Sequence, residues 1–391
     1  MAPGLTTVMK TMLPALILLS AACLEPRRVA PSCFLIKSRA GSPMKRKPNI
    51  ATVAERAGVA VSTVSRYLND RYVSRKARAK IAKVIELLDY TPSSTARNLS
   101  LGRVGCIGVV VDSSQDPWFT RLLAGIETEL STRDSSLMLA STELTGQYDP
   151  RIVFEWIRER RVDGLIVAKS QRRDRLLIRR AVDAQLPTVL VAPDEAFHQV
   201  QLVRCDNRAA GVIVANYLVQ LGHTRIAFVG GPRHSIDSKH RLQGLRQGLQ
   251  KHRIALNPKR IFACGTYEAA AGATFAREFF EVPPDVTAIV FANDALASGF
   301  MRVAHQRKIR LPEELSIIGF DGLPEDELLW PALTSVAQPM REMGSAACRW
   351  LFEAIESPGR LQTIEFPMRL TVRESTAAPP VGVRAIANSA S

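Results

Sequence analysis

The chain has 391 residues, of which 46% are hydrophobic and 23% are charged, and its formal net charge is +15. This length and balance fit a globular protein of two or three domains and exclude a chain that is disordered throughout. The charge is uneven: residues 1–103 hold 18 Lys and Arg against 5 Asp and Glu, and the rest hold 34 against 32. The basic first quarter predicts a polyanion-binding end, although a solvated basic surface, a membrane surface or an acidic protein partner would also suit it.

Residues 1–43 form an extension with an apolar run, Met12–Cys23, that follows Lys10. The run resembles the core of a signal peptide, but it is shorter than the ~20 residues that a membrane-spanning helix needs. Met44 offers an alternative start. We interpret the extension as an over-extended gene start, with a disordered native extension and a real export signal as the alternatives.

Residues 44–92 are expected to form a small helical headpiece. Hydrophobic residues recur at helical spacing in three segments, Ile50–Ala57, Val61–Asn69 and Arg75–Leu88. Asn49 and Ser74 stand where N-caps would lie, and Gly58 supplies the positive φ that a tight turn between two helices requires. The spacing predicts a helix-turn-helix.

The second of these helices carries short polar side chains and one cation on its outer side: Ser62, Thr63, Ser65 and Arg66. Hydroxyl groups and a forked guanidinium suit a helix that lies in the major groove of DNA. The alternative is an ordinary helical bundle with a polar face.

The motif V-A-x-x-A-G-V-x-V-S-T-V-S-R over Val53–Arg66 resembles the headpiece of the lactose-repressor (LacI/GalR) family. The resemblance continues through Tyr72–Ser74 and Tyr90–Leu99 and then covers the chain to about residue 373. It implies a regulator that binds double-stranded operator DNA and changes its DNA affinity when a small molecule binds.

The resemblance assigns roles to the matching residues. Three would touch base edges: Val61, Ser62 and Arg66. Five would lie near phosphates and fix the register: Asn49, Thr63, Ser65, Asn69 and Ser74. In the hinge helix and linker of residues 93–103, Ala96 would allow close entry into the minor groove and Leu99 would wedge open a base step.

The sequence departs from the family pattern at two places in and near the headpiece loops. Thr52 stands where the family usually has Asp, and the stretch Asn69–Val73 is one residue shorter than usual.

Residues 104–373 read as an α/β domain. Seven apolar, β-rich runs are expected to be strands buried on both faces: Ile107–Val111, Leu137–Ala140, Gly164–Val167, Thr188–Val191, Ile226–Val229, Ala288–Phe291 and Leu315–Gly319. Helical patterns separate them, among them Thr120–Ser131, Ala209–Leu221, Arg241–His252 and Ala295–Gln306. The alternation predicts parallel sheets covered by helices.

The resemblance implies a two-lobed, periplasmic-binding-protein-like effector domain. Lobe one would comprise residues 104–204 and 334–373, and lobe two residues 205–333, with a disordered tail over residues 374–391. Six residues would face a sugar or sugar acid between the lobes: Trp118, Phe119, Arg241, Tyr267, Asn293 and Asp321. The alternatives are core packing for the first two, a helix cap for Asn293, beside Asp294 as the better cap candidate, and a turn for Asp321.

The remaining sequence features predict no further functional site. None of the six cysteines forms a CxxC pair, so we interpret them as reduced thiols, and we predict no metal, cofactor or catalytic residue. His223 is expected to be structural, and the Arg-rich run Arg172–Arg180 to be a solvated helix face.

These observations predict a cytoplasmic homodimeric repressor, with inducer and corepressor modes both open. The rivals are an exported solute-binding protein of the same two-lobed fold and a sugar-acting enzyme.

Overall fold

The computed structural model describes residues 48–68, 71–90, 102–112, 116–133, 135–143, 147–194, 197, 199–359 and 361–380. The chain divides into two compact units, residues 1–91 and residues 92–391. Four sequence expectations lie outside the described residues: the extension 1–43, Asn69, the hinge helix with Ala96 and Leu99, and the tail after residue 380. None of the helices in the described ranges combines the length and the apolar character that a bilayer crossing requires.

The first unit contains three helices, α1 (Ile50–Ala57), α2 (Val61–Leu68) and α3 (Arg75–Leu88). Their inward faces share one small core, made by Val53, Ala54, Ala57, Val64, Val73 and Ile81. Gly58 ends α1 with φ +62°, as the turn before α2 requires, and its N–H donates to the carbonyl oxygen atoms of Ala54 and Glu55. The helix-turn-helix expected from the sequence is therefore present.

Side chains cap α1 and α3 at their first turns. The Asn49 Oδ1 accepts the backbone N–H of Thr52 at 2.9 Å, and the Thr52 hydroxyl accepts the N–H of Asn49 in return. Ser74 caps α3 by accepting the N–H of Ala77 at 3.4 Å. Thr52, which departs from the family pattern, thus completes a capping box with Asn49.

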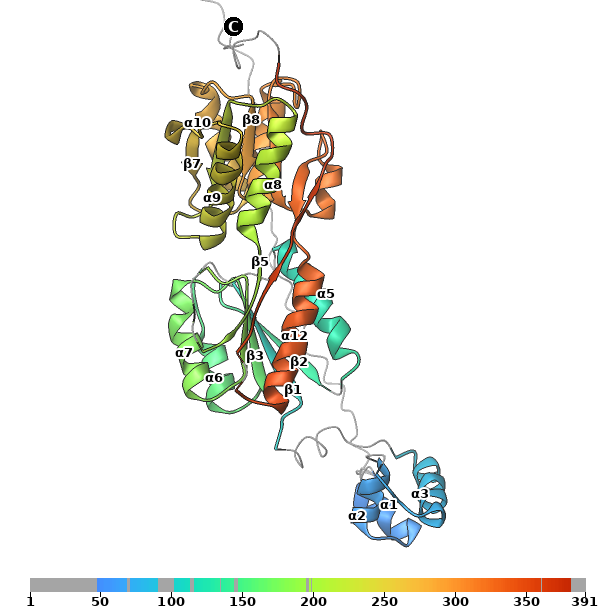
Figure 1. Cartoon of the computed structure of the whole chain (residues 1–391). Helices are drawn as coiled ribbons and strands as arrows, with labels where there is room; N and C mark the ends of the chain where they lie inside the picture. Colours follow the sequence, from blue (N-terminus) through green and yellow to red (C-terminus); the bar gives the residue numbers. More distant parts are fainter. Residues whose placement is uncertain are drawn as a thin grey trace, which may run out of the picture. The chain divides into compact units, whose positions relative to one another are not determined.

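The second unit has two lobes, each built on a six-stranded sheet (Figure 1). The lobe-one sheet is parallel throughout, in the order β11 (Thr363–Phe366), β5 (Gln201–Cys205), β4 (Thr188–Val191), β3 (Gly164–Ala168), β1 (Cys106–Val111) and β2 (Ser136–Ser141). Helices α5 (Pro117–Leu130) and α12 (Met340–Glu356) cover one face, and α6 (Arg151–Arg158) and α7 (Arg175–Asp183) cover the other. Buried apolar residues alternate between these two cores along the central strands.

The lobe-two sheet has the order β12 (Arg369–Thr371), β10 (Thr334–Ala337), β9 (Ser316–Asp321), β8 (Ala288–Phe291), β6 (Ile226–Gly230) and β7 (Ile261–Ala263). Only β12, at the edge, runs antiparallel to its neighbour within this sheet. Helices α8 (Asn207–Gln220) and α9 (Ile236–Lys251) pack on one face, and α10 (Ala269–Glu281) and α11 (Asp294–Gln306) on the other. Three short 3₁₀ segments, Arg172–Asp174, Pro258–Arg260 and Pro324–Leu328, complete the described elements.

The lobe boundaries expected from the sequence were wrong at the C-terminal side. Strand β10 pairs with β9 and therefore belongs to lobe two, α12 and β11 return to lobe one, and β12 crosses back to lobe two. Strand pairing decides the assignment: β10 lies between β9 and β12 in the lobe-two sheet, and β11 and β12 form edges of the two sheets.

The expected disorder of residues 374–391 was wrong for its first residues. Ser375 is fully buried, where its hydroxyl donates to the Ile317 carbonyl oxygen at 2.6 Å and accepts the N–H of Thr334 at 2.8 Å. The Ala377 carbonyl oxygen lies 2.8 Å from Nε2 of buried His223, whose Nδ1 lies 2.9 Å from the Thr287 hydroxyl. Burial lowers the pKa of His223. This histidine therefore ties the C-terminal segment to lobe two, as its expected structural role requires.

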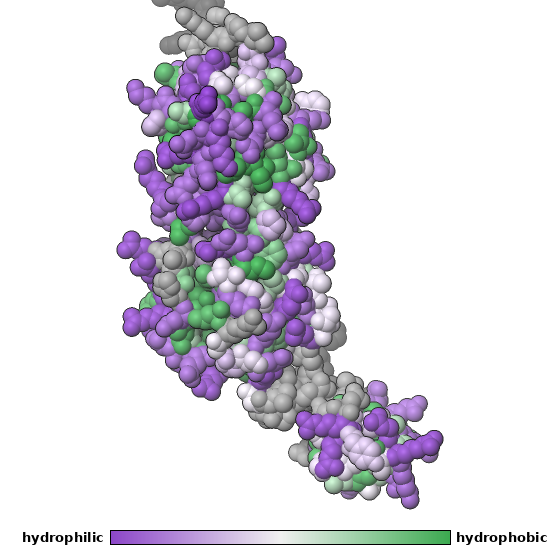
Figure 2. Space-filling model, viewed as in Figure 1, coloured by the Kyte–Doolittle hydropathy of each residue, from purple (hydrophilic) through white to green (hydrophobic). Residues whose placement is uncertain are grey.

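The burial of strand β2 and the exposure of the Arg-rich run were also predicted from the sequence. Strand β2 is not buried on both faces, because it forms the edge of its sheet and leaves Leu139 43% exposed. Of the run Arg172–Arg180, the arginines of α7 are exposed while Leu177 and Ile178 are buried, as expected for a solvated helix face, but Arg173 is half-buried and paired with Glu143, so the expectation was wrong there. The view in Figure 2 is mostly hydrophilic over the body, with hydrophobic side chains in smaller groups.

Candidate functional site

The outer surface of α2 is the first candidate site. Val64 turns inward and is fully buried, so the side chains about one half-turn away point outward. Ser62 and Arg66 are exposed, Val61 is 45% exposed, and Thr63 and Ser65 are half-buried. One side of a single helix therefore presents hydroxyl groups and a guanidinium together.

Asn49 and Ser74 use their side chains as helix caps. Each therefore stands at a helix N-terminus, where backbone N–H groups and the helix dipole favour an anion. This position is consistent with the phosphate neighbourhood predicted for both residues.

The second candidate site is a cavity of about 780 Å³ between the two lobes. Its walls come from residues just after parallel strands: Asp112 after β1, Lys169 after β3, Asp194 after β4, Asn293 after β8 and Asp321 at the end of β9. The carboxyl edges of both sheets thus face each other, which is where ligands bind in open α/β folds.

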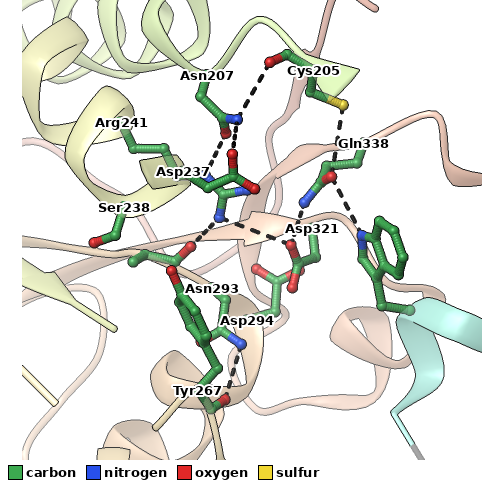
Figure 3. Close-up of polar contacts among 12 residues, drawn as sticks. Cys205, Asn207, Asp237, Ser238, Arg241, Tyr267, Asn293, Asp294, Asp321 and Gln338 are labelled. Atoms are coloured by element: carbon green, nitrogen blue, oxygen red, sulfur yellow. Dashed lines mark hydrogen bonds and ion pairs between the residues drawn. The ribbon is translucent and has the colours of Figure 1, made fainter. Parts of the chain in front are cut away.

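Arg241 lies near the centre of the polar contacts in this cavity (Figure 3). Its Nε donates to Oδ1 of Asn207 at 2.7 Å, its Nη1 donates to the Ala292 carbonyl oxygen, and the guanidinium lies 4.7 Å from the centre of the Phe320 ring. Only 3% of the residue is exposed. A charge buried this deeply needs such partners to remain ionised.

The close approach of α8 and α9 sets the position of Arg241. A side-chain carbon at Gly211 of α8 would overlap the carbonyl oxygen of Arg241, and one at Gly244 of α9 would overlap that of Arg208. Asn207, which accepts from Arg241, is the first residue of α8. Two glycines without side chains therefore bring these partners together.

Asp321 faces Arg241 from the end of β9. Its Oδ1 lies 4.0 Å from Nη1 of Arg241 and accepts Nε2–H of Gln338 at 2.6 Å. Burial raises the pKa of Asp321 to about 7, although Arg241 opposes that shift. Its φ of +128° is unusual for a residue with a side chain and marks local backbone strain at the site.

Asn293 and Tyr267 are joined by a hydrogen bond at the cavity wall. The Asn293 Nδ2 donates to the Tyr267 carbonyl oxygen at 3.0 Å, while its Oδ1 caps α11 by accepting the N–H of Leu296 at 3.0 Å. Asn293 is thus the cap, and the expectation that Asp294 caps this helix was wrong. Asp294 instead accepts from the Ser335 hydroxyl at 2.6 Å and from the N–H of Gly322 at 2.6 Å.

Trp118 and Phe119 have different environments. Trp118 lines the cavity, and its Nε1–H donates to Oε1 of Gln338 at 3.3 Å. Phe119 does not line the cavity: it packs edge-on against Trp118 inside the core and is 1% exposed. The prediction that Phe119 faces the effector is corrected accordingly: both residues are 1% exposed and belong to one core, as the core-packing alternative expected, and of the two only Trp118 also lies in the cavity lining.

Sequence reasoning missed several cavity residues: Lys169, Asp194, Asp237 and Gln338. The Nζ of Lys169 lies 2.9 Å from Oδ2 of Asp116 and 4.5 Å from the centre of the Trp118 ring. Lys169 lies two residues after the predicted strand Gly164–Val167, so the strand-end rule could have found it. Gln338 lies in a crossover whose lobe was assigned wrongly, and Asp237 precedes the predicted start of its helix.

Asp194 connects the lobes directly. This lobe-one carboxylate accepts from the Ser235 hydroxyl at 3.0 Å and from the N–H of Ile236 at 3.2 Å, both at the start of α9 in lobe two. Tyr267 donates its hydroxyl hydrogen to Ser235 at 2.7 Å. The cavity wall and the contact between lobes therefore share Ser235.

Carboxyl groups outnumber cationic groups around the cavity. Lobe one contributes Asp112, Asp116, Glu143 and Asp194, and lobe two contributes Asp237, Glu268, Asp294, Asp321, Glu325 and Asp326. The lysine and arginine side chains in the same lining are Lys169, Arg173 and Arg241.

Known proteins match both units. The model of the lacI family of bacterial regulatory proteins matches residues 49–93, and that of the periplasmic binding protein-like domain matches residues 215–376. The ribose operon repressor of Escherichia coli is 32% identical over 312 residues, which cover 78% of this chain and 92% of the repressor.

Solved structures agree in fold. A lac repressor dimer bound to operator and an anti-inducer has a TM-score of 0.70 at 24% identity, covering 85% of this chain and all of that one. A LacI family regulator from Enterococcus faecium with bound ribose has a TM-score of 0.61 at 26% identity, covering 70% and 99%. With its helix-turn-helix unit and its two-lobed body, the chain therefore belongs to the LacI family of bacterial transcriptional regulators.

Proposed function

We propose that the protein is a repressor that reads operator DNA with α2 and that a small sugar bound between the lobes controls its operator affinity. The observation that carries this proposal is the separation of two polar sites: an exposed surface on a short helix, and a buried, hydrogen-bonded cavity in a body of two lobes. The first suits a macromolecule and the second a small ligand.

Arg66 would supply base reading, because its exposed guanidinium can donate two parallel hydrogen bonds to O6 and N7 of guanine. Val61 and Ser62 would contact neighbouring base edges. Thr63, Ser65, Asn49, Ser74 and Asn69 would fix the register on phosphates, and Ala96 and Leu99 of the hinge would enter the minor groove, as proposed from the family pattern.

The protein would act as a homodimer with two headpieces on a pseudo-palindromic operator. The lac repressor, which has the same fold, is a dimer on its operator in the matched structure. Two-fold symmetry in the protein then matches two half-sites in the DNA. We place the protein in the cytoplasm, where the chromosome lies, and assign it no catalytic step.

The effector would be held by Arg241, Asp321, Asn293, Tyr267 and Trp118. A ribose-bound relative and a ribose operon repressor support a sugar as the ligand class. Guanidinium donors and carboxylate acceptors bond vicinal hydroxyl groups, and the half-buried ring of Tyr267 can cover the apolar side of a sugar. Binding would change the lobe angle through contacts such as that of Asp194 with α9, to the extent that the sugar prefers one angle.

Selection from a pool of randomised palindromic duplexes tests the DNA half of the proposal. The full-length protein should enrich one operator sequence, and Arg66→Ala should weaken that operator by about 1–3 kcal/mol and relax preference at one base pair per half-site. Arg66→Lys is the matched control for charge, since it keeps the cation and loses the fork.

Arg66→Lys should retain the salt dependence of binding and lose the base preference. Equal loss on all sequences for Arg66→Ala would make Arg66 a phosphate contact instead. A protein that binds a sugar but prefers no duplex would contradict the proposal and favour a solute-binding protein.

A further inference from the structure

The charge of the cavity wall restricts the charge of any molecule that enters it. Ten carboxyl groups line the cavity, against three Lys and Arg side chains. Several of these carboxyl groups are deeply buried: Asp321 is 7% exposed, Asp326 3% and Asp294 2%, and burial raises the pKa of all three, so the negative charge of the wall comes mainly from the other seven. A charge placed among them would be poorly screened by water, so its sign would matter strongly.

Each of the three cations already has partners within the protein. Lys169 is paired with Asp116 at 2.9 Å, Arg173 with Glu143, and Arg241 donates to Asn207 and to the Ala292 carbonyl oxygen beside Asp321. A carboxylate or phosphate ligand would have to displace one of these partners. It would then leave the half-buried Asp116 or Glu143, or the buried Asp321, without its cation, and the cost is highest for the buried group.

The buried carboxyl groups already resist ionisation. Burial raises the pKa of Asp237 to about 6 and that of Asp321 to about 7. A second negative charge nearby would raise both pKa values further, so an anionic ligand would either be repelled or have to bind together with protons.

The aromatic wall does not favour a cation either. The ammonium group of Lys169 lies 4.5 Å from the centre of the Trp118 ring and 5.3 Å from that of Phe119. The ring face that would attract a cationic ligand therefore already holds one, and a second positive charge there would be repelled.

From these contacts we infer that the effector is an uncharged, hydroxyl-rich molecule and that the cavity excludes sugar acids and sugar phosphates. The inference rests on the proposed function and narrows its ligand class. Hydroxyl groups can donate to a carboxylate and accept from a guanidinium or amide at once, so an uncharged polyol uses both kinds of wall group and disturbs no ion pair.

Calorimetric titration of the full-length protein at pH 7.5 with matched ligand sets tests this inference. One set is D-ribose, D-ribonate and D-ribose 5-phosphate, and another is D-glucose, D-gluconate and 2-amino-2-deoxy-D-glucose. At least one of the two neutral sugars should bind. Its anionic counterpart should bind at least roughly tenfold more weakly, because a single repulsion between two negative charges in a partly buried site contributes about this much.

Two isosteric variants locate the cause of the exclusion. Asp237→Asn removes one cavity charge and should reduce the ratio of neutral to anionic affinity severalfold. Glu278→Gln removes an exposed charge from α10 of the same lobe, outside the cavity lining, and should leave that ratio unchanged.

An anion or aminosugar that binds as tightly as its neutral parent would overturn the inference. If that charged ligand also changes operator affinity, the proposed function would still hold. An equal change of the affinity ratio in both variants would also overturn the inference. Absence of binding by every ligand of every charge would count against the inference and the proposed function together.

Discussion

The outer surface of α2 and the cavity between the lobes are both polar, but they are built in opposite ways. The α2 surface lies on two turns of one helix, and its residues at positions 61, 62 and 66 are exposed. The cavity draws side chains from both sheets and several helices, and these are largely bonded to one another: Arg241 to Asn207, Asn207 to Asp237, and Gln338 to Asp321 and Trp118 (Figure 3).

This difference indicates how each site would recognise its ligand. A preformed network in a buried cavity fixes the orientation of every donor before a ligand arrives, so removal of one member should disturb the others. Exposed side chains on a helix act more independently, and each should contribute its own share of binding.

The largest expected effect comes from removing the centre of the cavity network. Arg241→Ala should weaken effector binding by roughly 100-fold or more, because it removes charged hydrogen bonds and leaves Asp321 buried without its cation. Operator binding without effector should persist. Calorimetry with the sugar and anisotropy with the operator measure the two effects.

Arg246→Ala, an exposed arginine on the same helix, should change neither quantity. If Arg241→Ala retained the effector response, Arg241 would not belong to the effector site. The contrast between an interdependent cavity network and independent side chains on α2 would then be wrong.

The next effect concerns the core that orients α2. Val64→Ala removes two methyl groups from a fully buried position in a small unit and should destabilise the headpiece by about 2 kcal/mol. Operator binding should then fail at a lower temperature than effector binding does. Parallel melting of both activities would show that the two units are not independent, contrary to the expectation.

A smaller effect is expected from the contact between lobes. Asp194→Ala removes the acceptor of two hydrogen bonds at the start of α9 and should weaken effector binding by roughly five- to tenfold, since each bond contributes about 1 kcal/mol or less. Asp183→Ala breaks an exposed ion pair on α7 and serves as the control, with no change expected. Equal effects of the two variants would exclude Asp194 from lobe closure.

The smallest effect is a pH dependence of stability that arises in the cavity. Because burial raises the pKa of Asp321 to about 7, its neutral form is favoured in the folded state. That contribution to stability is present below the unfolded pKa near 4 and is lost as pH rises through about 7. The melting temperature of Asp321→Asn relative to the wild type should therefore rise between pH 4 and pH 8, and a pH-independent difference would contradict the assigned burial.

The sequence predicted the headpiece better than the cavity for a physical reason. Helical period places Val64 inside and Arg66 outside within one short segment, and Asn49, Gly58 and Ser74 mark the ends of helices locally. All of these signals act over a few residues.

The cavity depends on contacts between residues far apart in the sequence. Gln338 bonds Trp118 across 220 positions, and Asp294 bonds Ser335 rather than its own helix. Trp118 lines the cavity, but Phe119, one position later and equally buried, does not. No local pattern distinguishes these outcomes, and the crossing of β10 and β12 into lobe two is likewise decided by strand pairing.

One thermodynamic cycle shows whether the sugar site controls the DNA site. The affinity of the full-length protein for its selected operator and for a scrambled duplex of equal length is measured with and without a saturating neutral sugar that it binds. The sugar should change operator affinity by roughly 5- to 150-fold and leave scrambled-duplex affinity nearly unchanged. An operator affinity that stays the same with the sugar bound would contradict this expectation.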